Sequence, residues 1–415
     1  MSVGGSGIPR LQDISYIEVA VGQVAAGANF DQIRRAVISR AAETARDSDT
    51  DGSFDERRWE AALAKPTEHV HNAVDVLKEL MRLRWLERHI LPSGPGSAYL
   101  HAEATFNLTE AGEEWAELAR SDRRAAYNAL VGVLMDAHPQ FEGYLRAVGA
   151  RPDSRGTHMT IPLLRWDSVR DAHEDEYLNS MVQYAAAAVE SGKVGWTADR
   201  ATIDAGVRSY VGRIRARMQA RGKPVTRKQF VNTCEEAITR VAFAAVDCPL
   251  DYVSMELLRR WMRFLGIANF SYYAPGPYAL RLWSTGTVAG RGDGATISRR
   301  VGPQVRREAL DGLLKAWQEM RAEPGGSSMY LPIWELRAAV CWQKRINDDE
   351  FDKAIVEALN GSHGDLGFAI HLDQASMRAT PGSTRPLVLP TASGLRRVFN
   401  VISVMPAATS SKEMS

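Results

Sequence analysis

The chain has 415 residues, with 51 Lys and Arg against 50 Asp and Glu, so its formal net charge is only +1. This length predicts two to four domains, and a composition of 45% hydrophobic and 24% charged residues excludes an intrinsically disordered chain. Because the average charge offers phosphates no attraction, a nucleic-acid-binding role requires that the basic residues be concentrated in one part of the molecule.

The three cysteines, Cys234, Cys248 and Cys341, are far apart and form no C-x-x-C pair. They predict neither a zinc site nor a disulfide framework, and a reducing cytoplasm is the expected setting. The N-terminus lacks the basic start and apolar core of a signal peptide. The longest apolar run, residues 184–189, is too short to span a bilayer, so no membrane association is expected.

The N-terminal part begins with a Gly/Ser-rich leader over residues 1–12 and then predicts three helices, at 16–26, 30–45 and 54–64. Asp31 is placed to cap the second helix. Residues 47–53 open in the D-x-D-x-D-G order of a calcium loop, but Arg58 stands where that loop needs Glu. A solvated acidic loop is therefore expected.

The next helix has one apolar face, and its polar positions include Asp75 and Glu79, which we expect on the solvent side. Trp85-Leu86 then begins a strand, followed by a Gly/Pro turn at 92–98 and a strand-like segment that ends at Leu108. Two further helices are predicted at 109–118 and 124–134. The apolar face consists of Ala73, Val76, Leu80 and Leu83.

The middle of the chain, residues 166–219, predicts helix with few strand signals. Its start, Asp167–Glu176, is acidic, whereas residues 208–228 are strongly basic. After this stretch the predicted elements are helices at 230–245 and 255–265, strands at 267–273 and 278–283 around a Pro-Gly-Pro turn, a Gly/Arg-rich loop at 286–302 and a helix at 304–321.

A linker at 323–328 precedes the last part of the chain. There Asn347 and Glu350 have the spacing of a capping box for a helix at 348–359. The other elements expected in this part are a helix at 332–342, strands at 368–372 and 386–389, a final helix that starts at 391–394 and a disordered tail after Pro406.

The segment from Leu80 through Trp85-Leu-Glu-Arg to Phe106-Asn-Leu-Thr-Glu-Ala-Gly112 resembles the core of winged-helix proteins related to bacterial MarR- and PadR-type regulators. It departs from that family at Arg84, where a helix-ending Gly is usual. Segments 257–283 and 348–394 are similar in pattern only. The resemblance implies DNA binding, in which the helix before the wing reads base edges.

The expected fold class is therefore mainly α with small β-ribbons, with tandem winged-helix domains joined by a helical middle region. The expected domains are a flexible leader (1–12), an N-terminal winged-helix domain with extra helices (13–150), a helical basic linker region (151–225), a second winged-helix-like domain (226–322), a third (323–405) and a disordered tail (406–415).

Basic residues point to the second module as the main DNA contact. Its predicted helix at 255–265 carries three arginines and has no acidic residue after Glu256. Upstream of this helix lie eight basic residues, with no Asp or Glu between Ala205 and Cys234. Tyrosines beside the Pro-Gly-Pro turn are placed to stack on bases or lie along the backbone. The alternative for any such charge run is a solvated surface. The predicted DNA-binding residues are Arg82, Arg84, Arg213, Arg215, Arg217, Arg221, Lys223, Arg227, Lys228, Arg259, Arg260, Arg263, Tyr272, Tyr273, Arg299 and Arg300.

The third module has the opposite charge. Its candidate recognition helix carries Asp348, Asp349, Glu350, Asp352 and Glu357, which would repel phosphates. Residues 323–405 are therefore expected to dock a protein partner or to have a purely structural role.

Motifs for catalysis are lacking. There is no P-loop and no G-x-S-x-G, and the glycines of 290–294 have the wrong spacing for a dinucleotide. His69 and His71 lie on different faces of a helix, which excludes zinc chemistry of the HExxH type. Solvated helix starts explain the carboxylates of 173–176 and 348–352, where magnesium is the alternative. No enzyme activity, metal or cofactor is expected.

The function expected from the sequence is non-enzymatic binding of double-stranded DNA, as a subunit of a larger prokaryotic DNA-handling or phage-defence complex. One alternative is a kleisin-like bridging subunit whose winged helices dock ATPase or SMC-type partners. Another is a one-component transcriptional regulator.

Overall fold

The computed structural model of the chain is mainly helical, with small antiparallel sheets, as the sequence predicts. It describes residues 11–48, 54–65, 68–87, 102–154, 156, 158–169, 173–273, 276–322, 328–361, 366–374, 385–390 and 396–406. The chain divides into two compact units. The first unit comprises Met1–Tyr144, Leu250–Leu265 and Val288–Ile297, and the second comprises the remaining segments. The predicted domain limits stay predictions.

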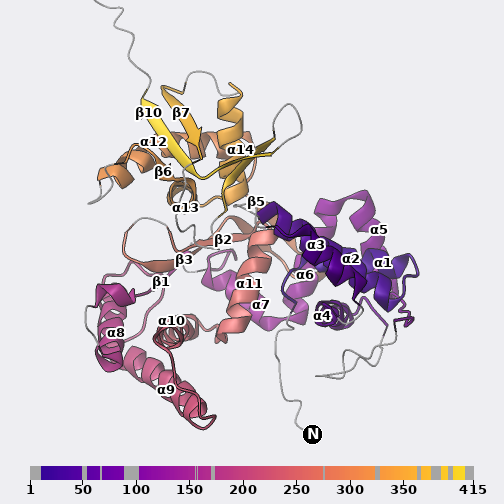
Figure 1. The fold of residues 1–415 in the computed structure, drawn as a ribbon, viewed down its shortest axis with the longest axis horizontal. Helices are drawn as coiled ribbons and strands as arrows, with labels where there is room; N and C mark the ends of the chain where they lie inside the picture. Colours follow the sequence, from indigo (N-terminus) through magenta and orange to yellow (C-terminus); the bar gives the residue numbers. More distant parts are fainter. Residues whose placement is uncertain are drawn as a thin grey trace, which may run out of the picture. The chain divides into compact units, whose positions relative to one another are not determined.

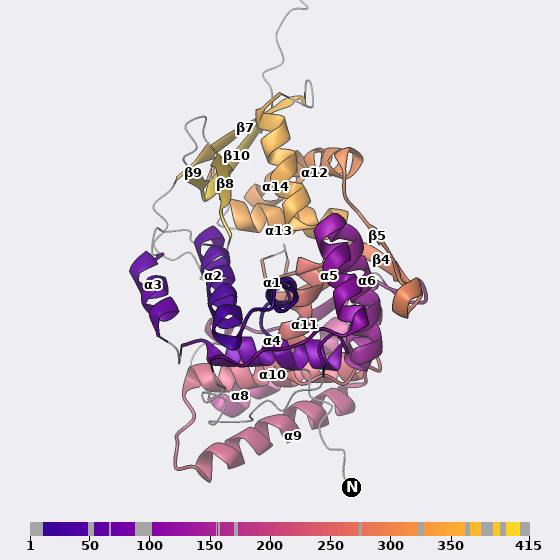
Figure 2. The ribbon, with the colours of Figure 1, turned by 90° about the vertical axis from the view of Figure 1, so that its right-hand side faces the viewer.

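The first unit is built from helices that pack around α1 and α2, with α4 and α5 against α1 (Figure 2). Its helices are α1 (Ser15–Ala25), α2 (Phe30–Ser48), α3 (Glu56–Ala64), α4 (Val70–Arg82), α5 (Glu110–Ser121), α6 (Arg123–Ala137) and α11 (Tyr252–Phe264), and it also holds the short 3-10 helix η3 (Gly292–Gly294). Helix α7 (Pro139–Ala147) runs across the boundary between the units.

The end of α4 is joined to the start of α5 by close packing. Thr109 caps α5, since its hydroxyl accepts a hydrogen bond from the Gly112 amide and donates one to the Arg84 carbonyl (2.7 Å). A Cβ atom at Gly112 would lie 2.1 Å from the Trp85 carbonyl oxygen, so only glycine fits there. The Trp85 ring stacks on Trp115 at 4.7 Å. This packing fixes how the segment after α4 returns to α5.

Short antiparallel bridges accompany this packing. Leu86 pairs with Leu108, and Asn29 pairs with Thr105. The predicted strand at Trp85-Leu86 is therefore present only as a bridge. The predicted turn at 92–98 lies outside the described residues.

The second unit contains a three-helix group of α8 (Glu174–Glu190), α9 (Arg200–Gln219) and α10 (Arg227–Ala244), which lie side by side (Figure 1). Both α8 and α10 pack on β1 (His158–Pro162), which pairs with β3 (Ala279–Ser284), and β3 also pairs with β2 (Ala268–Ser271). The sheet order is β1-β3-β2, all antiparallel. A 3-10 helix, η2 (Trp166–Ser168), lies between β1 and α8 in sequence.

The C-terminal part of this unit repeats that strand order. Its sheet has the order β6-β10-β7, with the last strand in the middle, and packs on three helices over a core that includes Trp317, Phe351 and Ile402. The elements are α12 (Pro303–Ala322), β6 (Leu331–Pro332), α13 (Ile333–Lys344), α14 (Asp348–Leu359), β7 (Phe368–Asp373), β8 (Leu387–Pro390), β9 (Arg396–Phe399) and β10 (Val401–Pro406). Strands β8 and β9 pair with each other.

Two predicted elements are wrong. The final helix is instead β9 and β10. Three of the four residues Val401-Ile-Ser-Val404 are β-branched, and this run forms the buried central strand between β6 and β7. The loop at 286–302 contains a two-stranded sheet of β4 (Gly286–Ala289) and β5 (Thr296–Arg299). Strand β1 and helix α7 have no counterpart among the predicted elements.

Two predicted caps are also wrong. Asn29, not Asp31, caps α2 through reciprocal bonds with Gln32, while Asp31 pairs with Arg34 and Arg35. Asn347 occupies the N-cap position of α14 but makes no side-chain cap bond.

The carboxylates predicted to face solvent are mostly used inside the fold. Glu79 is fully buried and contacts His138. On α14, Glu350 is buried beside Arg306 (3.0 Å), Glu357 also pairs with Arg306, and Asp352 pairs with Arg337 (2.8 Å). These pairs remove much of the predicted repulsion between α14 and phosphates.

Within the described part of the chain, no helix combines the length and the apolar character needed to cross a membrane.

Candidate nucleic-acid interface

The most concentrated positive charge of the described chain lies on α9, the start of α10 and the segment between them. Arg213, Arg217 and Arg221 recur every fourth residue, which places them along one face of α9 and its C-terminal extension. All three are exposed, as are the basic residues that follow them. We call the set of six the α9–α10 basic surface: Arg213, Arg217, Arg221, Lys223, Arg227 and Lys228.

These six side chains form no ion pair with a described residue. The other two basic residues of the stretch differ. Arg208 pairs with Asp204 (2.8 Å), and Arg215 pairs with Glu174 and Asp175 of α8. A segment without carboxylates therefore does not make every cation in it available, because the preceding turn of α9 supplies an acid to Arg208 and helix α8 supplies two to Arg215.

Aromatic rings hold several guanidinium groups in place. Arg213 from α9 and Arg240 from α10 each lie 5.1 Å from the centre of the Tyr210 ring. The Tyr210 hydroxyl donates to Glu236 (2.8 Å), which fixes the ring between the helices. Cation–π contacts orient arginines without neutralising them. This arrangement leaves the N–H edges of Arg213 open to an acceptor such as phosphate.

A second aromatic support lies at the start of α10. The Arg227 guanidinium is 4.9 Å from the Trp166 ring centre, and Trp166 stacks on Tyr177 at the same centroid distance of 4.9 Å. Tyr177 is anchored in turn, since its hydroxyl donates to the Leu164 carbonyl, and Phe230 packs against both rings. The start of α10 is therefore built on a rigid aromatic base.

Burial changes the titration of groups beneath this surface. It raises the pKa of Glu235 to about 7 and that of Cys234 to about 12. For Tyr210, burial and then the bond to Glu236 raise the pKa to about 12. Cys234 is therefore a protonated, inert thiol at neutral pH.

The predicted residues of α11 belong to the first unit and are less available. Arg259 is mostly buried and pairs with Glu256 on its own helix, and Arg263 is half-buried and engaged with neighbouring groups. Arg260 is exposed. Of the three arginines that the sequence places on this helix, one therefore has an exposed guanidinium.

Arg82 and Arg84, also in the first unit, differ from each other. Arg82 lies 3.5 Å from Nδ1 of His138. Arg84 is exposed, and its backbone is left-handed, with φ of 61°. This is the position where the winged-helix family usually has glycine.

The remaining predicted residues are in the second unit and have internal roles. Arg300 pairs with Glu308 (2.6 Å) and donates to the Lys344 carbonyl. Tyr272 stacks on Tyr278 at 6.4 Å, and Tyr273 packs against the core. Arg299 is half-buried and engaged with neighbouring groups.

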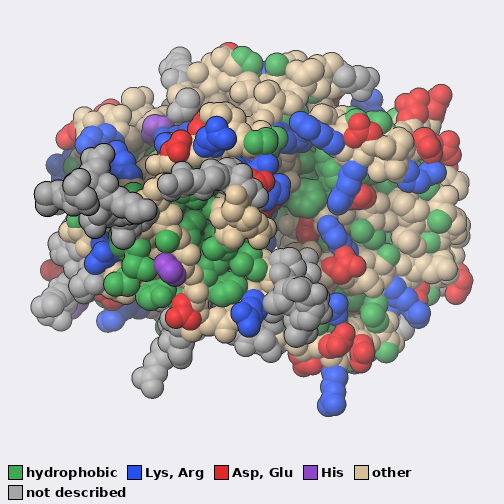
Figure 3. Space-filling model, turned by 90° about the horizontal axis from the view of Figure 1, so that it is seen from above, with side chains coloured by type: hydrophobic (Ala, Val, Ile, Leu, Met, Phe, Trp, Pro, Cys, Tyr) green, Lys and Arg blue, Asp and Glu red, His purple; other side chains and the backbone are tan. Residues whose placement is uncertain are grey.

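On the face drawn in Figure 3, Lys and Arg side chains are interspersed with Asp and Glu. In the described part of the chain, no three His, Cys, Asp or Glu residues are grouped so that they could hold a metal ion.

Sequence reasoning missed the residues that organise this surface. Arg240, Tyr210 and Trp166 are not among the predicted residues, because their contribution depends on helix packing. Only the basic run itself carried a signal in the sequence.

No protein family, curated protein or solved structure matches this chain.

Proposed function

We propose that this chain binds double-stranded DNA through the α9–α10 basic surface and carries out no reaction on it. The observation that carries this proposal is that six exposed cations form no ion pair with a described residue, whereas many arginines elsewhere in the described chain are paired with carboxylates. Unpaired exposed cations on one helix pair supply the sequence-independent attraction on which DNA affinity largely rests.

The expected strength follows from the number of contacts. If all six cations contact phosphates of B-form DNA, the logarithm of the affinity falls with the logarithm of the salt concentration with a slope of about −5. Between 50 and 200 mM salt this slope corresponds to a loss of about 10³ in affinity. Such a dependence distinguishes a phosphate-binding surface from an apolar docking surface.

The tandem winged-helix arrangement is part of this proposal. It is supported by the left-handed Arg84 where the family has glycine and by the pairing of Leu86 with Leu108 after α4. It is further supported by the shared order of the two three-stranded sheets, β1-β3-β2 and β6-β10-β7. In this arrangement the α9–α10 basic surface holds the phosphate backbone.

The test is a titration of a fluorescent duplex with the full chain, followed by anisotropy at 50, 100 and 200 mM salt. Reversing three cations of the basic surface is expected to abolish measurable binding at 100 mM salt. The variant carries Arg217→Glu, Arg221→Glu and Lys223→Glu. A matched control changes the net charge equally at exposed residues of the first unit through Arg57→Glu, Arg58→Glu and Arg124→Glu.

Equal losses in the two triple variants would mean that only net charge matters and would remove the surface from the proposal. No binding by the parent chain at 50 mM salt would overturn DNA binding altogether. The bridging role would then replace it.

A further inference from the structure

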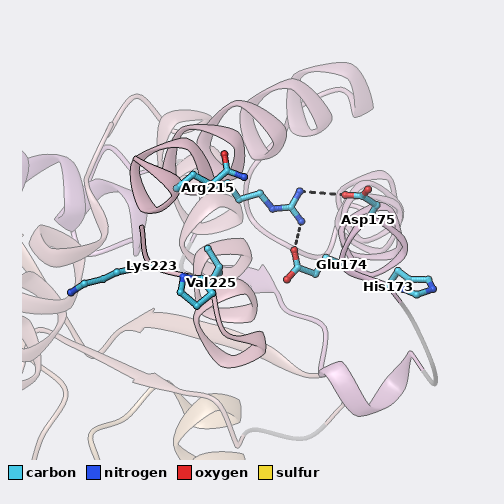
Figure 4. Close-up of a pocket in the computed structure, with 8 residues that line it drawn as sticks. His173, Glu174, Asp175, Arg215, Lys223 and Val225 are labelled. Carbon is cyan, nitrogen blue, oxygen red and sulfur yellow. Dashed lines mark hydrogen bonds and ion pairs between the residues drawn. The ribbon is translucent and has the colours of Figure 1, made fainter. Parts of the chain in front are cut away.

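A pocket adjoins the α9–α10 basic surface, between the first turn of α8, the end of α9 and the segment that leads to α10. Its volume is about 470 Å³. Figure 4 shows Arg215 extending from α9 towards Glu174 and Asp175. The lining residues are His173, Glu174, Asp175, Arg215, Gln219, Lys223, Pro224 and Val225.

Arg215 is held in this pocket from two directions. Its Nη2 lies 2.5 Å from Oε2 of Glu174, and its Nη1 lies 3.4 Å from Oδ1 of Asp175. Its guanidinium also lies 4.8 Å from the ring centre of the buried Phe230. The Phe230 ring holds the guanidinium in place. The two carboxylates contact its N–H edge, which is the edge that would otherwise bind an anion.

The two carboxylates are weak competitors for that edge. The Asp175 side chain is 79% exposed and Glu174 is 41% exposed, so water screens both. Lys223, whose ammonium points away from the ion pair in Figure 4, adds positive potential at the same pocket. A DNA phosphodiester carries one negative charge, as a single carboxylate does, but it arrives as part of a duplex whose neighbouring phosphates the α9–α10 basic surface contacts at the same time.

We infer that this pocket is a subsite for one backbone phosphate of the bound nucleic acid, and that Glu174 and Asp175 occupy Arg215 until that phosphate displaces them. This inference rests on the proposed DNA binding. It adds a seventh phosphate contact to the α9–α10 basic surface. It also means that the two acids in the first turn of α8 lower the affinity for DNA.

The test first neutralises Glu174 and Asp175 and then replaces Arg215, using the full chain and the same duplex. The variant Glu174→Gln with Asp175→Asn is expected to bind about three- to fivefold more tightly, the gain expected from releasing an exposed ion pair. Its salt slope should stay that of the parent chain, because the same phosphate contacts Arg215 in both, whereas Arg215→Gln should make the slope shallower by about 0.9. Arg215→Gln should cost more affinity in this background than in the parent chain, by the same factor.

A matched control makes an equal charge change outside the pocket through Glu190→Gln and Asp247→Asn, both at exposed positions. Circular dichroism melts of every variant verify the fold. The single variant Asp175→Asn repeats the affinity measurement with only the more exposed of the two acids neutralised. The inference is overturned if the control gains as much affinity, or if Arg215→Gln costs the same in both backgrounds. A parent chain that binds no duplex at 50 mM salt overturns the proposed function as well, a pattern distinct from either of these.

Discussion

Nε2 of His138 donates to Oε1 of Glu79 at 2.6 Å, and both side chains are buried in the first unit. The second carboxylate oxygen of Glu79 has no hydrogen-bond partner among the residues that the structure describes. A helix predicted to expose this acid therefore places it in the core instead, which makes the pair sensitive to the loss of one member.

We expect Glu79→Ala to lower the free energy of unfolding by about 3 kcal/mol, because it leaves a buried imidazole without its partner. The double variant Glu79→Leu with His138→Leu should lose less than the single one, since no polar group is then left unpaired. Urea unfolding followed by circular dichroism measures both. A double variant at least as unstable as the single one would contradict this account.

Two arginines with left-handed backbone should respond differently to replacement by glycine. Arg84 (φ 61°) is exposed, so Arg84→Gly should stabilise the chain by about 1 kcal/mol as the strain is relieved. Arg345 (φ 53°) has the same strain, but its guanidinium lies 3.7 Å from the Trp342 ring centre. Arg345→Gly should therefore gain less or destabilise, because it loses that contact. Thermal melts of the two variants compare them directly.

Glu235 predicts a pH-dependent stability. Its pKa is about 7 in the folded chain against 4.5 ordinarily, because burial disfavours the charged form. The folded state thus keeps a proton that the unfolded state releases between these values, so the contribution of Glu235 to stability falls as pH rises from 4.5 to 7. We expect a loss of about 2 kcal/mol, reduced for partial exposure.

The measurement is the urea midpoint of the parent chain and of Glu235→Gln at pH 5 and pH 8. The variant should lose this part of the pH dependence. Identical pH profiles would show that Glu235 ionises normally.

Tyr210 predicts a separate effect on DNA binding. Tyr210→Ala removes the ring that Arg213 and Arg240 share, so the two guanidinium groups lose their fixed position and we expect about a threefold loss of affinity. Tyr210→Phe keeps the ring and loses only the bond to Glu236, so it should bind like the parent. Equal losses in both variants, measured by anisotropy, would assign the effect to the hydroxyl.

The helices were the part of the fold that apolar periodicity could predict, because most of them bury one face. The final strand was not predictable in this way. Its residues Val401–Val404 are buried on both faces, so the run is apolar apart from Ser403 and shows no periodicity that separates a helix from a strand. The sequence does not reveal the roles of Glu79 and Asn347 because their partners, His138 and the Gly266 carbonyl, are remote in sequence.

The basic run of the candidate site was visible in the sequence, but the availability of each cation was not. The sequence does not distinguish Arg215 from Arg217, because Glu174 and Asp175, which pair with Arg215, come from another helix. Arg259 likewise looked available before Glu256, one helical turn away, proved to hold it. Local composition sets the total charge of a segment, while the neighbouring elements decide which charges remain for a ligand.

The six cations of the α9–α10 basic surface also have a chromatographic consequence. Subtracting them from the net charge of +1 leaves −5 for the rest of the chain. The isoelectric point of the sequence is about 7.8, where the average charge vanishes but this surface keeps its own. At that pH the protein should still adsorb to a sulfonated cation exchanger, and the triple variant at Arg217, Arg221 and Lys223 should pass through the column.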